Sequence, residues 1–313
     1  MRKIPFKASL FSTLTLLASS IAYAGGGGGN GGDNDGGLPA PDTCEVNCGY
    51  NQGSNPSLNS LQSTRGNFSV ATSNVPRSVS GFGGGTIYYP RNASGELATI
   101  AISPGFTARQ GAISWWGPVL ASNGFVVITI DTNSRLDQPI SRGRQLDSAL
   151  SYLISQGNSS NSPISGMVDE NRLASMGHSM GGGGALRSAS RNRLSAAIPL
   201  APFNVGGNSF NDIEVPTMIM ACESDGTAPV NIHASPFYNR IPSSTDKVLI
   251  ELDNGNHSCA NGGSGRNNAV LATYGVSWMK RFLDKDQRFT PFLCGPNHEA
   301  NRGISDYRDS SCS

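Results

Sequence analysis

The chain has 313 residues and a formal net charge of +1 at pH 7, and only 14% of its residues are charged. So small a net charge argues against recognition of nucleic acid or of an anionic membrane surface. The length is sufficient to bury a large hydrophobic core, and α/β folds of this size often form one domain.

The N-terminus has the pattern of a cleaved secretory signal peptide. Basic residues at positions 2, 3 and 7 precede an apolar run over 8–22, and small residues flank a cleavage site after Ala24. A membrane anchor is the alternative, but the run is short, contains Ser and Thr, and is followed by glycines. We expect residues 1–24 to be removed, the mature protein to be secreted, and no membrane anchor to remain.

Two stretches without periodicity follow the signal peptide. Residues 25–38 are almost entirely Gly, Asn and Asp, a composition typical of a flexible tether. Residues 39–66 form a lead-in in which Cys44 and Cys48 are close enough to pair with each other. We therefore assign residues 25–66 to the tether and lead-in, and residues 67–313 to the folded domain.

From residue 67 onward, strand and helix patterns alternate. Residues 68–72 and 85–89 alternate as paired antiparallel strands do, whereas 97–102 and 125–130 are the continuous apolar runs of buried strands. Further strands are expected at 172–176, 196–200, 216–222 and 247–252, and helices at 113–121, 142–154, 180–192, 232–239 and 268–283. This order predicts an α/β fold with one mostly parallel sheet and helices on both faces.

The strand at 172–176 runs into the motif Gly-His-Ser-Met-Gly over 177–181, which a small-residue helix follows. A Gly-x-Ser-x-Gly turn between a strand and a helix is the nucleophile elbow of α/β-hydrolases, which projects the hydroxyl of Ser179 above the sheet. Such a turn leaves no room for Cβ atoms at Gly177 and Gly181. Because the chain is rich in Gly and Ser, an accidental glycine-rich turn is the alternative.

A nucleophilic serine needs an acid and then a histidine base later in the chain. Asp225 follows the strand at 216–222 and His257 follows the strand at 247–252, so both would lie at the sheet edge of Ser179. The competing acids and histidines are Glu223, Asp212, Asp253, His178, His233 and His298. We expect His178 to line the cleft, and His233 and His298 to be surface residues.

Six cysteines allow 15 disulfide connectivities. Cys222 and Cys259 lie close in sequence to the candidate acid and base, so a Cys222–Cys259 disulfide would join the two loops. Cys294 and Cys312 would then close the C-terminal tail. Because disulfides account for the cysteines, and the histidines and acids lack metal-binding spacing, we expect no metal ion and no cofactor.

Two backbone amides are needed to stabilise an oxyanion. One is the amide of Met180, which follows the candidate nucleophile. The other is the amide of Phe106, in the loop at 103–107 that follows an early strand. We expect the Phe106 ring to lie over the cleft, and burial in the core is the alternative.

These motifs resemble those of the bacterial cutinase and poly(ethylene terephthalate) hydrolase family, from about Asn67 to Ser313. The similar motifs are Ser-Pro-Gly-Phe-Thr at 103–107, Gly-His-Ser-Met-Gly-Gly-Gly-Gly at 177–184, Ala-Pro at 201–202, Ala-Cys-Glu-Ser-Asp at 221–225, Ala-Pro-Val at 228–230 and Asn-His-Ser-Cys-Ala-Asn at 256–261. The resemblance implies a secreted α/β-hydrolase without a cofactor that hydrolyses polyesters and short acyl esters. It places the triad on Ser179, Asp225 and His257.

The resemblance also bears on the substrate cleft. The disulfide near the triad and Ser258 resemble the polyester-hydrolase branch, because plain cutinases usually lack the bridge and carry Phe after the catalytic histidine. Phe203 stands where the family commonly has Trp, and His178 is the cutinase-like residue at its position. We expect an open cleft without a large lid, lined by Phe106, His178, Met180, Phe203, Thr227 and Ser258.

The expected partner is therefore a polymeric or small ester substrate, and we expect a monomer that binds no nucleic acid. A lipase or general carboxylesterase acting on acylglycerols is the alternative enzyme. A secreted binding module that keeps the fold without turnover is an alternative of another class, and the complete set of Ser, Asp and His argues against it.

Overall fold

The computed structural model describes residues 38–39, 48–205, 209–262, 267–299, 301, 303–310 and 312, all within one compact unit of residues 35–313. The signal peptide, nearly all of the tether and Cys44 lie outside the described residues, so the cleavage site and the pairing of Cys44 with Cys48 stay predictions. In the part of the chain that is described, no helix is long and apolar enough to cross a membrane.

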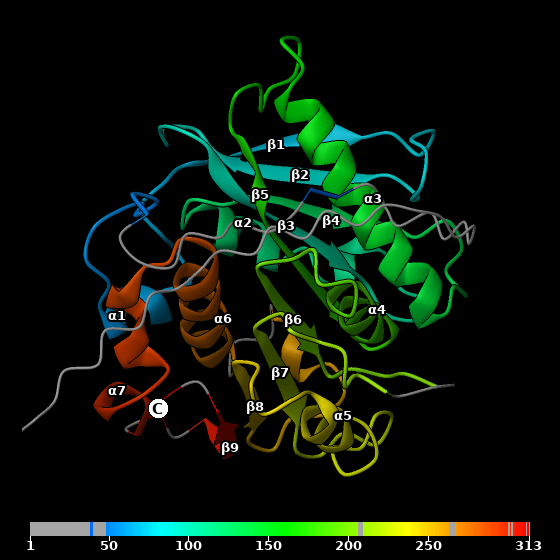
Figure 1. The fold of residues 1–313 in the computed structure, drawn as a ribbon, viewed down its shortest axis with the longest axis vertical. Coiled ribbons are helices and arrows are strands. Elements are labelled where there is room, and N and C mark those ends of the chain that lie inside the picture. Colours follow the sequence, from blue (N-terminus) through cyan, green and yellow to red (C-terminus); the bar gives the residue numbers. More distant parts are fainter. Residues whose placement is uncertain are drawn as a thin grey trace, which may run out of the picture. The chain divides into compact units, whose positions relative to one another are not determined.

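Within the described residues, nine strands form one sheet in the order β1-β2-β4-β3-β5-β6-β7-β8-β9 (Figure 1). The strands are β1 Val70–Val75, β2 Gly85–Pro90, β3 Leu97–Ser103, β4 Val126–Ile130, β5 Val168–His178, β6 Ala196–Leu200, β7 Thr217–Cys222, β8 Lys247–Leu252 and β9 Ile304–Asp309. Neighbours from β4 to β8 pair in parallel, whereas β1–β2, β2–β4 and β8–β9 are antiparallel. The predicted mostly parallel sheet is confirmed.

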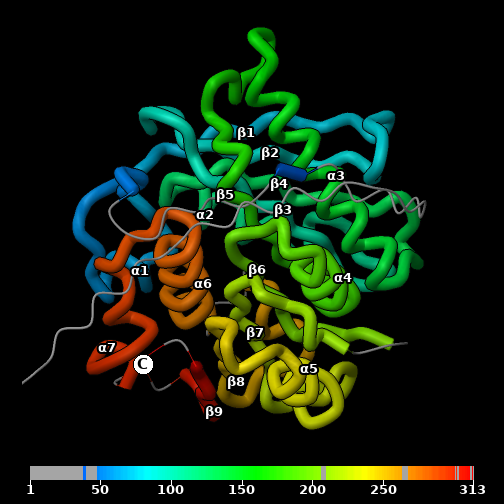
Figure 2. The backbone as a smooth tube through the Cα atoms, viewed as in Figure 1, coloured from blue at the N-terminus to red at the C-terminus, as the bar shows by residue number. Residues whose placement is uncertain are grey.

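Helices cover both faces of this sheet. They are α1 Leu58–Gln62, α2 Trp116–Ala121, α3 Pro139–Gly157, α4 Met180–Ala189, α5 Ala234–Arg240, α6 Asn268–Leu283 and α7 Pro296–Glu299, with 3-10 helices at Gln110–Ala112, Cys259–Asn261 and Gln287–Phe292. Residues of α1, α2 and α6 share one hydrophobic cluster, and residues of α3, α4 and α5 share the other. Accordingly, α6 lies on the opposite side of the strands from α3 and α4 (Figures 1 and 2).

The strands that separate these two clusters are buried on both faces. Along β3, Ile100 and Ile102 belong to the cluster with α6, and Ala101 belongs to the cluster with α3. Successive side chains of a strand point to opposite faces, so a continuous apolar run is what a sheet covered on both sides requires. This confirms the reading of the continuous apolar runs as buried strands.

The structure differs from the sequence predictions mainly near the C-terminus. The strand β9 was not predicted, because Ile304–Asp309 carries only two large apolar side chains and is at most half-buried. It exists as a strand because its backbone pairs with β8, for example Tyr307 opposite Ile250. The helix expected at 113–121 is also shorter, since α2 begins at Trp116 after a separate 3-10 turn.

Candidate active site

Ser179 occupies a strained turn between β5 and α4. Its φ of 57° and ψ of −119° lie outside the ordinary regions for a side-chain-bearing residue. A Cβ at Gly177 would lie 2.3 Å from the Gly181 carbonyl oxygen, and one at Gly181 would lie 2.3 Å from the Ser103 carbonyl oxygen. The expected exclusion of side chains at these two glycines is confirmed.

The loops after β5, β7 and β8 bring Ser179, Asp225 and His257 together. The Nε2 atom of His257 lies 2.9 Å from Ser179 Oγ, and its Nδ1 atom lies 2.7 Å from Asp225 Oδ2. A carboxylate only accepts hydrogen bonds, so Nδ1 carries the proton and Nε2 is free to accept the serine proton. The arrangement is that of a nucleophile, a general base and an orienting acid.

The Asp225 carboxylate is held in its ionised form. Burial by itself would raise the pKa of Asp225, since its side chain is only 1% exposed. The hydrogen bond from His257 and the backbone amides of Ala228 and Thr227, at 2.7 and 2.8 Å, outweigh burial and hold this pKa below its ordinary value. Of the competing acids, Glu223 instead accepts a hydrogen bond from the Asn254 amide at 2.7 Å.

The loop after β3 passes directly beside the nucleophile. A Cβ at Gly105 would lie 3.0 Å from the Cβ of Ser179. The neighbouring Phe106 is 45% exposed, so its ring lies at the surface and not in the core. Among the described residues, no acceptor engages the amides of Phe106 and Met180. Their role as oxyanion donors stays a prediction.

Arg142, which the sequence analysis missed, holds this loop by hydrogen bonds to backbone carbonyl groups. It is completely buried and donates to the carbonyl oxygens of Pro104 at 2.9 Å, Arg135 at 3.0 Å and Asp137 at 2.7 Å. Burial lowers the pKa of Arg142 to about 10, while Asp137 opposes the shift, so the guanidinium remains charged at neutral pH. The available signal was a basic residue within the amphipathic pattern at 142–154.

His178 is almost wholly buried beside the base. It is 6% exposed, and its Nε2 atom donates a hydrogen bond to the His257 carbonyl oxygen at 2.7 Å. Burial lowers the pKa of His178 to about 4, against the opposing effect of the His257 carbonyl. His178 is therefore neutral at pH 7 and braces the backbone of His257. Its part in lining the cleft stays a prediction.

The expectation of a surface position is wrong for His233, whereas His298 is partly exposed. His233 is 8% exposed and its ring stacks on Phe203 with centroids 4.6 Å apart. His298 is half-buried, because the buried hydroxyl of Tyr274 lies 2.6 Å from its Nδ1 atom and the ring of Tyr307 stacks on it at 3.9 Å. Burial lowers the pKa of both histidines. In both cases an aromatic partner distant in sequence covers the imidazole.

The remaining predicted cleft residues differ in exposure. Thr227 and Ser258 are exposed, and Phe203 and Met180 are half-buried. Each belongs to a loop or helix start that follows the carboxyl end of one of the strands β5 to β8. They share the sheet edge of Ser179, and their contact with a substrate stays a prediction.

Two disulfides lie in the described part of the chain. Cys222 and Cys259 are bonded with Cα atoms 6.0 Å apart, joining the loop of Asp225 to the loop of His257. Cys294 and Cys312 are bonded with Cα atoms 5.6 Å apart near the C-terminus. Over the described ranges, no group of three or more His, Cys, Asp or Glu side chains is arranged to hold a metal ion.

Comparisons with known proteins agree on one family. The family model described as "PETase: PET hydrolase-like" matches residues 44–313, so the similarity begins before Asn67, where the sequence analysis placed it, and includes Cys44 and Cys48. "Cutinase est1" of Thermobifida alba is 49% identical over 84% of this chain and 86% of its own length. "Bis(hydroxyethyl) terephthalate hydrolase" of Streptomyces coelicolor is 47% identical over 87% of this chain and 86% of its own.

Proposed function

The chain belongs to the PET hydrolase-like family, and we propose that it is a secreted serine hydrolase that cleaves the ester bonds of polyesters, aromatic ones included, and of short-chain acyl esters. As a family member it is a carboxylic ester hydrolase. The names of its relatives, which include cutinases and a hydrolase of a terephthalate diester, support a polyester substrate. The N-terminal pattern over residues 1–24 supports secretion.

One observation carries the proposed mechanism: the hydrogen-bond chain from Ser179 through His257 to Asp225, with distances of 2.9 and 2.7 Å. In the first step Ser179 Oγ attacks the ester carbonyl carbon while His257 Nε2 accepts its proton. Asp225 stabilises the imidazolium that forms, because its carboxylate stays ionised.

The negative charge that develops on the carbonyl oxygen needs hydrogen-bond donors. We assign this role to the amides of Phe106 and Met180, which flank the nucleophile from the loop after β3 and from the start of α4. The amide of Met180 belongs to the first turn of its helix, where the partial positive charge of the helix end favours an oxyanion.

The second half of the reaction releases the acid. His257 returns its proton to the leaving alcohol oxygen as the tetrahedral intermediate collapses to an acyl-enzyme on Ser179. A water molecule, deprotonated by His257, then attacks the acyl carbon, and the acid leaves as Ser179 regains its proton. Overall one ester and one water yield one alcohol and one carboxylic acid.

The test uses purified residues 25–313 on three substrates: a film of poly(ethylene terephthalate), a soluble 4-nitrophenyl ester and a long-chain triacylglycerol emulsion. The proposal predicts product release from the film and hydrolysis of the soluble ester, both lost in Ser179→Ala. Hydrolysis of the soluble ester and the triacylglycerol without release from the film would establish the lipase alternative. Activity retained by Ser179→Ala would refute the mechanism.

A further inference from the structure

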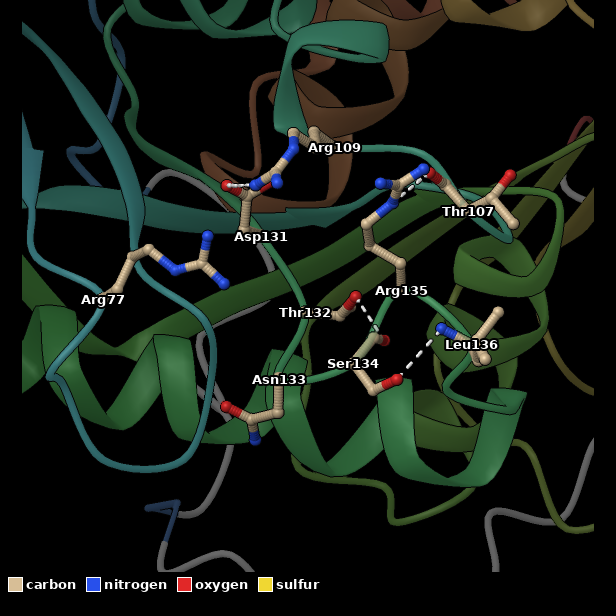
Figure 3. A pocket seen from close by; sticks show the side chains of 9 residues that line it. All are labelled: Arg77, Thr107, Arg109, Asp131, Thr132, Asn133, Ser134, Arg135 and Leu136. Atoms are coloured by element: carbon tan, nitrogen blue, oxygen red, sulfur yellow. Dashed lines mark hydrogen bonds and ion pairs between the residues drawn. The ribbon is translucent and has the colours of Figure 1, made fainter.

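Three arginines line a cavity of about 310 Å³ next to the loop that carries Phe106 (Figure 3). Arg77 comes from the turn after β1, Arg109 from the loop after β3, and Arg135 from the loop after β4. Asp131 is the one acidic residue among the described residues that line the cavity. Two positive charges are therefore left over in this arginine cavity, although the whole chain has a net charge of only +1.

Contacts within the protein satisfy only part of the hydrogen-bonding capacity of these guanidinium groups. Arg109 approaches Asp131 at 3.7 Å, and Asp131 is further held by the Gln110 amide at 2.8 Å. The Nε atom of Arg135 donates to the Thr107 carbonyl oxygen at 2.6 Å, and its terminal nitrogens have no hydrogen-bond partner in the described part of the chain. Among the described residues Arg77 has no ion-pair partner, and Figure 3 shows its guanidinium extending toward the side of Asp131.

The arginine cavity is tied to the candidate active site through Thr107. The amide of Thr107 donates to the Arg135 carbonyl oxygen at 2.8 Å, so the two residues are joined by reciprocal hydrogen bonds. Thr107 directly follows Phe106, a proposed oxyanion donor. In the sheet, β4 and the strand of Ser179, β5, are separated only by β3, which places the carboxyl ends of the two strands roughly 10 Å apart.

We propose that the arginine cavity binds the carboxylate of acid-ended esters, such as the monoester of an aromatic diacid, while their remaining ester bond lies at Ser179. This inference rests on the proposed function, because each ester hydrolysis leaves a new carboxylic acid that is ionised at neutral pH. Planar guanidinium groups match the two oxygens of a carboxylate. The arginine cavity thus favours the charged intermediates that hydrolysis of a neutral polyester generates.

The kinetic test compares mono(2-hydroxyethyl) terephthalate, which carries one carboxylate, with its neutral diester. The double variant Arg77→Gln and Arg109→Gln leaves the Arg135–Thr107 hydrogen bonds in place. We expect its KM for the monoester to rise about tenfold relative to its KM for the diester at low ionic strength. The double variant Arg65→Gln and Arg91→Gln, an equal loss of two charges at exposed residues outside the arginine cavity, is the matched control. The same ratio of the monoester KM to the diester KM in wild type and in the double variant of Arg77 and Arg109 would overturn the inference.

A binding experiment separates this inference from the proposed function. Terephthalate is titrated into the Ser179→Ala protein by calorimetry, with and without the two arginine substitutions, and inorganic phosphate is the competing anion. We expect terephthalate to bind more tightly than phosphate. Its affinity should fall about tenfold when the two arginines are replaced. Such binding, found together with a wild-type protein that hydrolyses no ester, would reject the proposed function alone. Absent binding, or phosphate bound equally well, would reject the carboxylate site.

Discussion

Two buried side chains hold the backbone of loops beside Ser179. His178 donates to the His257 carbonyl oxygen, and Arg142 donates to the Pro104 carbonyl oxygen. Each replaces the water that a buried carbonyl group would otherwise need, so both loops are held by a specific hydrogen bond. A reactive geometry depends on such support, since small displacements of catalytic groups lower the rate strongly.

At the scale of single residues, we predict that His178 makes the stability of the fold depend on pH. Its pKa is about 4 in the folded protein and 6.5 in the unfolded chain, so folding favours the neutral form. The unfolded chain binds the extra proton between these values, and stability is lost as the pH falls through this range. The loss reaches about 3 kcal/mol in the free energy of unfolding near pH 4.

Urea unfolding of wild type and His178→Gln from pH 7 to pH 4 measures this effect. The variant cannot take up the proton, so its free energy of unfolding should fall less steeply with decreasing pH. His233 and His298 titrate in both proteins and cancel in the comparison. Parallel pH profiles would show that His178 does not carry the predicted linkage.

At the scale of elements, one disulfide joins loops of the candidate active site and the other lies near the C-terminus. Cys222–Cys259 joins the loop after β7 to the loop after β8, which hold Asp225 and His257. Cys294–Cys312 instead closes the chain around α7 and β9, and links neither of these two loops covalently. The sequence separations of the two bonds are 37 and 18 residues, so the first closes the longer loop.

We predict that both disulfides stabilise the fold but that only one supports activity. The loop-entropy model gives about 4 kcal/mol for the Cys222–Cys259 bond and about 3 kcal/mol for Cys294–Cys312. Replacing Cys222 and Cys259 by Ser should lower both the melting temperature and kcat, whereas replacing Cys294 and Cys312 should lower the melting temperature alone. The assay is run well below both melting temperatures. An equal loss of kcat in the two variants would contradict a specific role for the first bond.

At the scale of the whole molecule, exposed apolar residues gather near the sheet edge of Ser179. In the described part of the chain, the large hydrophobic side chains with substantial exposure are Phe106, Leu136, Ile140, Val205 and Ile232. They follow the carboxyl ends of β3, β4, β6 and β7, which is the edge where the triad lies. Apolar residues collected around a candidate site are typical of a surface that meets an apolar partner.

We predict that these residues assist adsorption to a solid polyester. Replacing Ile140 and Ile232 by Ser removes apolar area that binding to the film would bury, and each buried isoleucine is worth about 1.5–3 kcal/mol at most. Product release from a polyester film should fall severalfold or more at limiting enzyme concentration. Hydrolysis of a soluble nitrophenyl ester by the same variant is the internal control and should be unchanged. A parallel loss on both substrates would indicate damage to the catalytic site instead.

The amino-acid sequence by itself determined the fold class, most strand positions and the elbow, because these depend on patterns within a few neighbouring residues. The continuous apolar runs at β3 and β4 required a sheet covered on both faces, and the glycines around Ser179 required a turn without side chains. The order of Ser, Asp and His after successive strands also followed from chain position.

Only the tertiary structure decided which distant groups meet. It placed His233 under Phe203, directed Arg142 at two separate loops, and made a strand of β9 by pairing it with β8. It also gathered Arg77, Arg109 and Arg135, which lie up to 58 residues apart along the chain, around one cavity. Such contacts join segments that no local pattern relates, since burial and hydrogen bonding depend on what the fold brings alongside each side chain.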